Sequence, residues 1–253
     1  MSVVIHLLFC YNLQYKIKIY MKGTRNMNKP VIGIISKHSE KDEIRPNTYI
    51  RDEVKQAIFD NGAVAIGILL PKDEKLDVGD DWVNNLSLDE YDSLIAQINL
   101  CDGIIFQGGG ACDNYEMIVA KYCYDHDIPT LGICCGQNVI VRALGGTTYK
   151  IFNPEKHNQI TEDYVHNISI DALSKFYDIV KQKEIKVNSR HKKTIENSPL
   201  LEKVAFCEDG YPDVVESKEK RFYIGVRFHP ESLYKIDENM NNIFKYFIDV
   251  CKD

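Results

Sequence analysis

The stretch at residues 128–140 constrains the fold most, because an apolar run leads into a Gly-x-Cys-x-Gly sequence and then into a helix-like stretch. Gly132 and Gly136 stand two residues before and two after Cys134. A sharp strand-to-helix turn strains the backbone at its tip, and flanking glycines remove side chains that would clash there. The helix expected at about 137–144 would point its positive end at the sulfur and favour a thiolate. The segment therefore predicts a tight turn that exposes Cys134.

A second segment, residues 221–232, has the pattern of a strand that ends in His229, Pro230 and Glu231. Side chains two apart in an extended segment project to the same side, and Pro230 biases His229 toward extended conformations. We therefore expect His229 and Glu231 to face one partner. A nucleophilic thiol needs an adjacent base, and that base needs an orienting acceptor. Alone, His-Pro-Glu is more often a strand end, and Cys134 alone could be a buried thiol in an ordinary turn.

Together, in this order and separation, the two segments resemble the class I glutamine amidotransferase superfamily. Its members carry the same Gly-x-Cys-x-Gly turn, called the nucleophile elbow, and a carboxy-terminal His-Pro-Glu. A third segment, Val187-Asn-Ser-Arg-His191, is similar to the Asn-Ser-x-His stretch of the γ-glutamyl-γ-aminobutyrate hydrolase branch, which is peptidase C26-like. The resemblance extends over about residues 29–250. It implies a catalytic triad of Cys134, His229 and Glu231.

The resemblance also implies an oxyanion hole and a substrate site. Members of the branch have two glycines at the end of the strand before the elbow strand, and this chain has three, at 108–110. The backbone N–H groups of Gly109 and Cys135 would hold the oxyanion, and losing one such donor typically costs about a hundred- to a thousandfold in rate. The substrate-binding residues implied are Gly108, Gly110, Asn138, Ser189, Arg190 and His191.

The chain departs from the family pattern at three places. Asn138 replaces a Gln that helps hold the glutamyl portion of the substrate in relatives, and Cys135 replaces a residue that is commonly Arg. The branch usually has a second His and a Gln after the first His, whereas this chain has Lys192 and Lys193 after His191. This basic cluster either attracts a substrate carboxylate or forms a solvated loop.

Alternating apolar runs and helical stretches predict an α/β fold with a parallel sheet covered on both faces. This is a flavodoxin-like, doubly wound, mostly parallel sheet with a small antiparallel extension. The expected parallel strands lie at 31–35, 64–70, 103–106 and 130–133. The expected helices lie at 48–61, 87–98, 115–126 and 238–250. The later strands are expected at 165–170, 185–187, 204–208, 213–216 and 222–228.

Composition excludes several functions. The 253 residues hold 31 Lys and Arg against 37 Asp and Glu, a net charge of −6, which disfavours nucleic acid and anionic membrane surfaces as partners. The eight cysteines contain no Cys-x-x-Cys pair, so their spacing indicates neither a zinc site nor a disulfide framework. We expect a cytoplasmic protein in a reducing compartment, with no metal ion and no organic cofactor.

Residues 1–26 do not match the rest of the chain, because they are apolar and aromatic and hold four basic residues and no acidic ones. Lys16 and Lys18 interrupt the apolar run and no cleavage site follows. The segment therefore matches neither a secretory signal peptide nor a membrane-spanning helix. We expect a non-native or disordered extension at 1–26, with translation starting at Met27, or else a real extension that packs as a strand or partner arm. Residues 27–253 would form one hydrolase domain.

The resemblance implies cysteine-dependent hydrolysis of a γ-glutamyl amide, such as γ-glutamyl-γ-aminobutyrate, through a γ-glutamyl thioester. One alternative is a glutaminase that passes ammonia to a synthase partner. Another is a non-catalytic binding or regulatory protein on the same fold. The expected ligand is a small γ-glutamyl molecule, and a homodimer is the other protein association left open.

Overall fold

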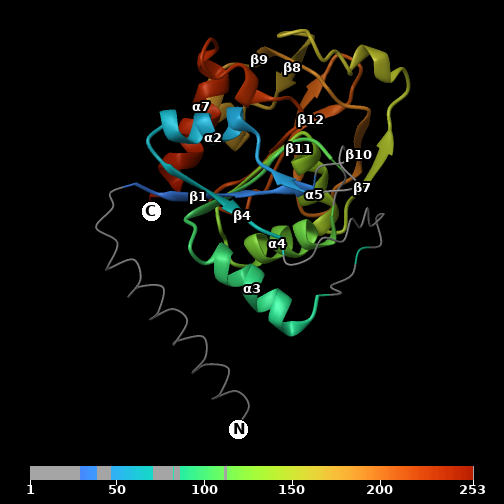
Figure 1. Cartoon of the computed structure of the whole chain (residues 1–253). Helices are drawn as coiled ribbons and strands as arrows, with labels where there is room; N and C mark the ends of the chain where they lie inside the picture. Colours follow the sequence, from blue (N-terminus) through green and yellow to red (C-terminus); the bar gives the residue numbers. More distant parts are fainter. Residues whose placement is uncertain (1–28, 39–46, 71–81, 83–85, 111–112, 253) are drawn as a thin grey trace.

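The computed structural model describes residues 29–38, 47–70, 82, 86–110 and 113–252 of the chain (Figure 1). The predictions for residues 1–26 and for a start at Met27 therefore fall outside the described residues. None of the helices in the described ranges combines the length and the apolar character that crossing a bilayer requires.

The core of the protein is a nine-stranded mixed sheet in the order β4-β1-β5-β6-β13-β12-β11-β8-β9. Its first five strands are parallel: β4 (Val64–Ile68), β1 (Val31–Ile35), β5 (Gly103–Phe106), β6 (Thr130–Ile133) and β13 (Tyr223–Val226). The other four are antiparallel: β12 (Pro212–Glu216), β11 (Glu202–Cys207), β8 (His166–Ile170) and β9 (Glu184–Val187). The predicted fold class is confirmed, with the extension forming one continuous sheet with the parallel strands.

Helices cover both faces of the parallel half, and each face has its own apolar core. Figure 1 shows α2 and α7 on one side of β1 and β4, and α3 and α4 on the other. The first core joins the sheet to α2 (Asp52–Asp60), α6 (Lys175–Val180) and α7 (Glu238–Val250). The second joins it to α3 (Leu88–Ile98), α4 (Asn114–Asp125) and α5 (Cys135–Ala143). Burial on both faces explains why the parallel strands are continuous apolar runs.

Capping residues decide where several helices begin. Ser87 and Glu90 form a reciprocal capping box at the start of α3, with 2.7 Å between the Ser87 backbone nitrogen and the Glu90 carboxylate. The Ser174 hydroxyl accepts from the backbone N–H of Tyr177 at 3.0 Å and starts α6. The Asp237 carboxylate accepts from two N–H groups in the first turn of α7.

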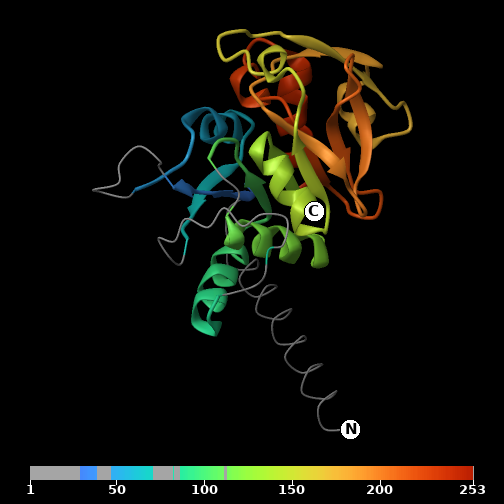
Figure 2. The same ribbon diagram turned by 90° about the vertical axis from the view of Figure 1, so that its right-hand side faces the viewer.

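Some element boundaries differ from the sequence-based predictions. The helix expected at 48–61 begins at Asp52, because β3 (Thr48–Tyr49) pairs with β2 (Lys37–His38) in a small sheet. The expected strand at 64–70 ends at Ile68. A second small sheet, β7 (Thr147–Lys150) with β10 (Lys193–Asn197), and the short helix α6 were not predicted. Figure 2 shows the antiparallel strands, in yellow to orange, beside α7 in red.

Among the described glycines, Gly136 has the least room for a side chain. A Cβ on Gly136 would lie 2.0 Å from the Phe106 carbonyl oxygen, in the backbone of β5. We expect Gly136→Ala to lower the free energy of unfolding by at least about 3 kcal/mol, because the buried backbone cannot move aside. Gly62→Ala is the matched control, since Gly62 has a φ of +84° but open space around its Cβ direction. Its cost should stay near 1–2 kcal/mol, roughly that of a left-handed backbone. Urea denaturation of both variants measures the difference, and equal losses would contradict the clash.

Candidate active site

Three adjacent parallel strands end at the candidate site. Gly108 follows β5, Cys134 follows β6 and His229 follows β13, and the paired registers Phe106↔Gly132 and Val226↔Ile133 bring the strand ends level. Ligands of such sheets bind beyond the carboxyl ends of the strands. The topology thus brings together residues that are 95 positions apart in the chain, Cys134 and His229.

The turn at Cys134 has the geometry that its glycines predict. Cys134 has φ 51° and ψ −102°, an unusual conformation for a residue other than glycine. A Cβ on Gly132 would lie 2.7 Å from the Gly136 carbonyl oxygen, so the two glycines let the strand and helix pass closely. The Cys134 N–H donates to the Val226 carbonyl at 2.8 Å, which ties the turn to β13. The 9 % exposed Cys134 side chain borders the cavity at the strand ends.

His229 contacts both other members of the predicted triad. Its Nδ1 lies 2.7 Å from a Glu231 carboxylate oxygen, and its ring lies close enough to the Cys134 sulfur for that sulfur to influence its pKa. Burial disfavours the imidazolium, but the Glu231 carboxylate and the Cys134 sulfur, as charges and as hydrogen-bond partners, outweigh it and raise the pKa of His229 to about 10. The site therefore favours a protonated His229 beside the sulfur.

The segment that carries His229 and Glu231 is not extended as predicted. β13 ends at Val226, and Pro230 opens a 3₁₀ turn, η2 (Pro230–Ser232). Proline suits the first position of such a turn because its fixed φ is already near the helical value. The contact between the two side chains forms across the start of this turn instead of along one side of a strand.

Asn188 fixes the backbone of His229, a role that sequence reasoning missed. Its side-chain oxygen accepts from the His229 N–H at 2.7 Å, and its amide nitrogen donates to the His229 carbonyl at 2.9 Å. Asn188 is 1 % exposed and follows β9 at the far edge of the sheet. The signal that could have found it is its place in the Asn-Ser-x-His stretch, whose other residues were expected to bind substrate.

The glycine run after β5 forms the wall opposite the elbow. Gly109 and Gly110 have φ values of +91° and +66°, which favour glycine. A Cβ on Gly108 would lie 2.8 Å from the His229 ring and 3.3 Å from the Cys134 Cβ, so Gly108 leaves the room in which those side chains meet. Gly109 and Cys135, the predicted oxyanion donors, both line the cavity, and Cys135 begins α5, where N–H groups point out of the helix end.

A buried ion pair lies beside Cys135. Lys37 Nζ is 2.7 Å from a Glu116 carboxylate oxygen and 3.9 Å from the Cys135 sulfur, and both charged side chains are at most 1 % exposed. Burial is the largest influence on Glu116 and, against the attraction of Lys37, raises its pKa to about 7. Sequence reasoning did not identify this pair, because the two residues lie on β2 and α4.

Arg227 links the turn at Cys134 to Asn138, one of the residues at which the chain departs from the family pattern. Its guanidinium donates to the Asn138 side-chain oxygen at 2.8 Å and to the Cys134 carbonyl at 3.3 Å. Asn138 therefore holds a buried arginine in the cavity wall as well as lining the cavity itself. Arg227 had no role in the sequence-based predictions.

Four of the predicted substrate-binding residues line the cavity: Gly110, Asn138, Arg190 and His191. Gly108 lies behind the triad side chains instead. Ser189 is fully buried, and its hydroxyl donates to the His157 carbonyl at 2.7 Å, so it supports the fold of the loop. Burial, followed by the nearby Arg227 charge, lowers the pKa of His191 and keeps its ring neutral.

The cavity at this site has a volume of about 770 Å³ and a basic wall. Six of its lining residues are arginines or lysines and two are carboxylates. The cations are Arg51, Arg142, Arg190, Lys192, Lys193 and Arg227; the carboxylates are Glu53 and Glu231. Among the described residues, neither Lys192 nor Lys193 forms an ion pair. The positive electrostatic potential of these residues favours a small anionic ligand.

The fold and the site together define an α/β protein arranged for cysteine chemistry on an acyl group. A family model described as Peptidase C26 matches residues 109–231. One component of the glutamine-hydrolyzing GMP synthase of Methanococcus aeolicus is 32% identical over 155 residues, which cover 59% of this chain and 73% of that protein. The chain belongs to the class I glutamine amidotransferase superfamily, which hydrolyses amide bonds with a cysteine.

Other similarities agree on the fold. The glutamine-hydrolyzing GMP synthase of Prochlorococcus marinus subsp. pastoris is 32% identical over 155 residues, 59% of this chain and 28% of that protein. The chain thus spans less than a third of the length of the first curated relatives it matches. A crystal structure described as a GMP synthase component from Thermoplasma acidophilum has a TM-score of 0.59 at 19% identity, over 88% of this chain and 94% of that one.

The environment of His229 predicts an unusual titration. Because its pKa is raised toward 10, the stability from the imidazolium is complete below about pH 6.5, its unfolded value, and is lost as pH rises through the folded value. In Glu231→Gln the midpoint should fall, and the stability deficit of this variant should shrink as pH approaches 10. NMR of ¹³C-labelled histidine measures the midpoint. Glu53→Gln, which alters a cavity carboxylate elsewhere, should leave it unchanged. A wild-type midpoint at or below 6.5 would contradict the prediction.

Proposed function

We propose that this protein hydrolyses a γ-glutamyl amide whose amine portion carries a carboxylate, as γ-glutamyl-γ-aminobutyrate does. The observation that carries the proposal is the contact of Cys134, His229 and Glu231 at the edge of a cavity with six cationic residues. Membership of the superfamily supports amide hydrolysis, and the charge of the cavity supports the choice of substrate class.

In the proposed reaction, the Cys134 sulfur attacks the γ-carbonyl carbon while its proton resides on His229. The N–H groups of Gly109 and Cys135 stabilise the oxyanion of the tetrahedral intermediate. His229 then protonates the leaving amine, and the C–N bond breaks to leave a γ-glutamyl thioester. Water that gives its proton to His229 attacks the thioester, and glutamate leaves as the sulfur is released. Glu231 orients the imidazole and stabilises its charge.

The excess of positive charge favours this substrate class over glutamine. Glutamine has one carboxylate and one ammonium group and no net charge, so it gains little from the basic wall. A γ-glutamyl amide of an amino acid carries one more carboxylate at its amine end. Lys192 and Lys193, both exposed at the rim, could pair with that group, and charge-assisted hydrogen bonds contribute roughly 1.5–3 kcal/mol.

A second candidate function is that of a glutaminase that supplies ammonia to a separate synthase. The similarity to the GMP synthase component of Methanococcus aeolicus favours it. Such a protein would act on glutamine and would be stimulated by a partner. The two functions share the same nucleophile and differ in the substrate group that the basic residues of the cavity bind.

The roles at the elbow predict a clear difference between two neighbouring cysteines. Cys134→Ala and His229→Ala should abolish glutamate release. Cys135→Ala should keep much of it, because Cys135 is proposed to act through its backbone N–H. Release is measured with the purified full chain, and circular dichroism checks that each variant folds. Equal loss at both cysteines would overturn Cys134 as the sole nucleophile.

The basic wall predicts a preference for an anionic leaving amine. The value of kcat/KM for γ-glutamyl-γ-aminobutyrate should exceed that for γ-glutamylpropylamide, which lacks only the carboxylate, by at least about tenfold, or 1.4 kcal/mol. Lys192→Met with Lys193→Met should remove most of this preference. Lys121→Met with Lys252→Met, at exposed sites away from the cavity, makes the same change in net charge and should not. Activity on glutamine alone, or only after a synthase is added, would favour the second candidate.

A further inference from the structure

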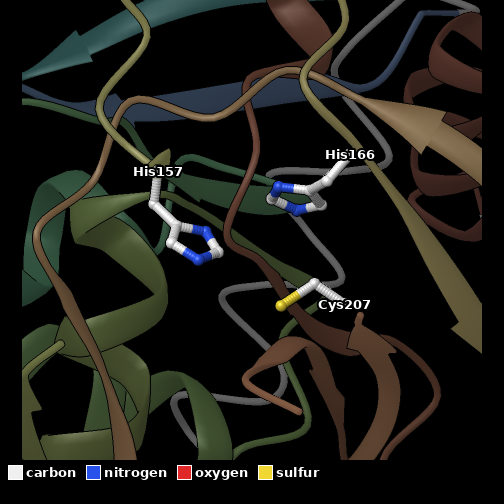
Figure 3. A group of neighbouring side chains, drawn as sticks. All are labelled: His157, His166 and Cys207. Carbon is white, nitrogen blue, oxygen red and sulfur yellow. The ribbon is translucent and has the colours of Figure 1, made fainter. Parts of the chain in front are cut away.

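Two histidines and a cysteine meet outside the triad. His157 follows η1 (Pro154–Lys156), His166 begins β8 and Cys207 ends β11. One ring nitrogen of each histidine and the Cys207 sulfur lie within 4.8 Å of one another. Figure 3 shows the two rings and the sulfur gathered about one point from three separate segments. The side chains are well buried, with exposed fractions of 3 % for His157, 11 % for His166 and 5 % for Cys207.

Each histidine pairs with a carboxylate through one ring nitrogen, Nε2. His166 Nε2 lies 2.7 Å from an Asp213 oxygen, and His157 Nε2 lies 3.2 Å from an Asp209 oxygen. Because an ionised carboxylate only accepts, each Nε2 carries the proton, and in the neutral ring Nδ1 presents a lone pair. Metal-binding histidines almost always have such a partner on the other ring nitrogen.

The second nitrogen of each ring has no hydrogen-bond partner among the described residues. Nδ1 of His157 and Nδ1 of His166 are both buried and unpaired. Leaving a buried acceptor unpaired is costly, so two such nitrogens in one cluster need an explanation. A shared cation would satisfy both lone pairs at once.

Cys207 lies on the same hairpin as the carboxylates that pair with the two histidines, Asp209 and Asp213. Burial and then the nearby Asp213 carboxylate raise the pKa of the Cys207 thiol, while backbone hydrogen bonds with Tyr211 and Asp209 oppose the rise. Binding of a metal ion would therefore release the thiol proton.

We propose that Nδ1 of His157, Nδ1 of His166 and Sγ of Cys207 bind one zinc-like divalent ion, with water in the fourth position. Imidazole and thiolate are the donors that zinc prefers. On a tetrahedral zinc such atoms would lie about 3.3–3.6 Å apart, given the usual Zn–N and Zn–S distances, so side-chain shifts of roughly 1 Å close the site.

The ion would join the loop of His157 to the antiparallel hairpin. The His157 carbonyl accepts from the Ser189 hydroxyl at 2.7 Å and from the His191 N–H at 3.0 Å. That stretch also contains Asn188, which holds His229. The metal would act as a structural brace behind the cavity and would take no part in the amide chemistry.

The test uses the full chain carrying Cys134→Ala, so that the triad cysteine cannot bind metal. Titration of the metal-free protein with zinc against a chromophoric chelator should give one equivalent bound. Cobalt(II) in place of zinc should produce a sulfur-to-cobalt charge-transfer band and the intense visible bands of a tetrahedral site. Zinc should also raise the Tm of the protein.

Adding Cys207→Ser should remove the charge-transfer band, and His157→Gln or His166→Gln should weaken zinc binding at least about a hundredfold. Cys123→Ser is the matched control, since Cys123 is another buried thiol, in the core around α4. It should bind as before. If Cys207→Ser does not fold, the titration of the parent protein still decides. Absence of stoichiometric zinc binding there, or a cobalt–sulfur band that survives Cys207→Ser, would overturn the proposal.

Discussion

The close passage of β6, α5 and β5 at the elbow is the constraint on which the site depends. Gly132 and Gly136 allow backbone atoms to approach where no Cβ fits, and this approach places Cys134 at φ 51°. A residue in that conformation costs of order 1–3 kcal/mol and persists only where the surroundings hold it. Here the Cys134 N–H is tied to β13, the strand that leads to His229. The strained cysteine and the candidate base are thus positioned by the same pair of strands.

Sequence patterns predicted β1, β5 and β6 to the residue, because strands buried on both faces are unbroken apolar runs between polar turns. The turn at Cys134 was predictable because glycine is needed at two fixed positions. β7 was missed since Thr147–Lys150 is polar and partly exposed, and α6 was missed since six residues are too few to display a helical period. The 3₁₀ turn after His229 was missed because an isolated His-Pro-Glu fits an extended segment equally well.

The contacts that sequence could not reveal join segments that are distant in the chain. Lys37 meets Glu116 across the strand ends, and Asn188 meets His229, with no local period to indicate either contact. The cluster of His157, His166 and Cys207 was not predicted for the same reason. Its members follow no metal-ligand spacing, yet the antiparallel extension brings their ligand atoms within 4.8 Å. Spacing rules detect sites built on one hairpin or helix, whereas this cluster needs three elements.

The Asn188 contact joins the last strand of the antiparallel extension to the end of the parallel half. β9 is four strands from β13 in the sheet order, which would place it about 19 Å away in a flat sheet at the usual spacing. Hydrogen bonds of 2.7 and 2.9 Å nevertheless join Asn188, one residue past β9, to His229, three residues past β13. The register shifts between β11 and β12 supply local bends, since bulges increase strand twist. The extension is therefore part of the site, because its last strand ends in the residue that fixes the candidate base, and its central hairpin carries Cys207.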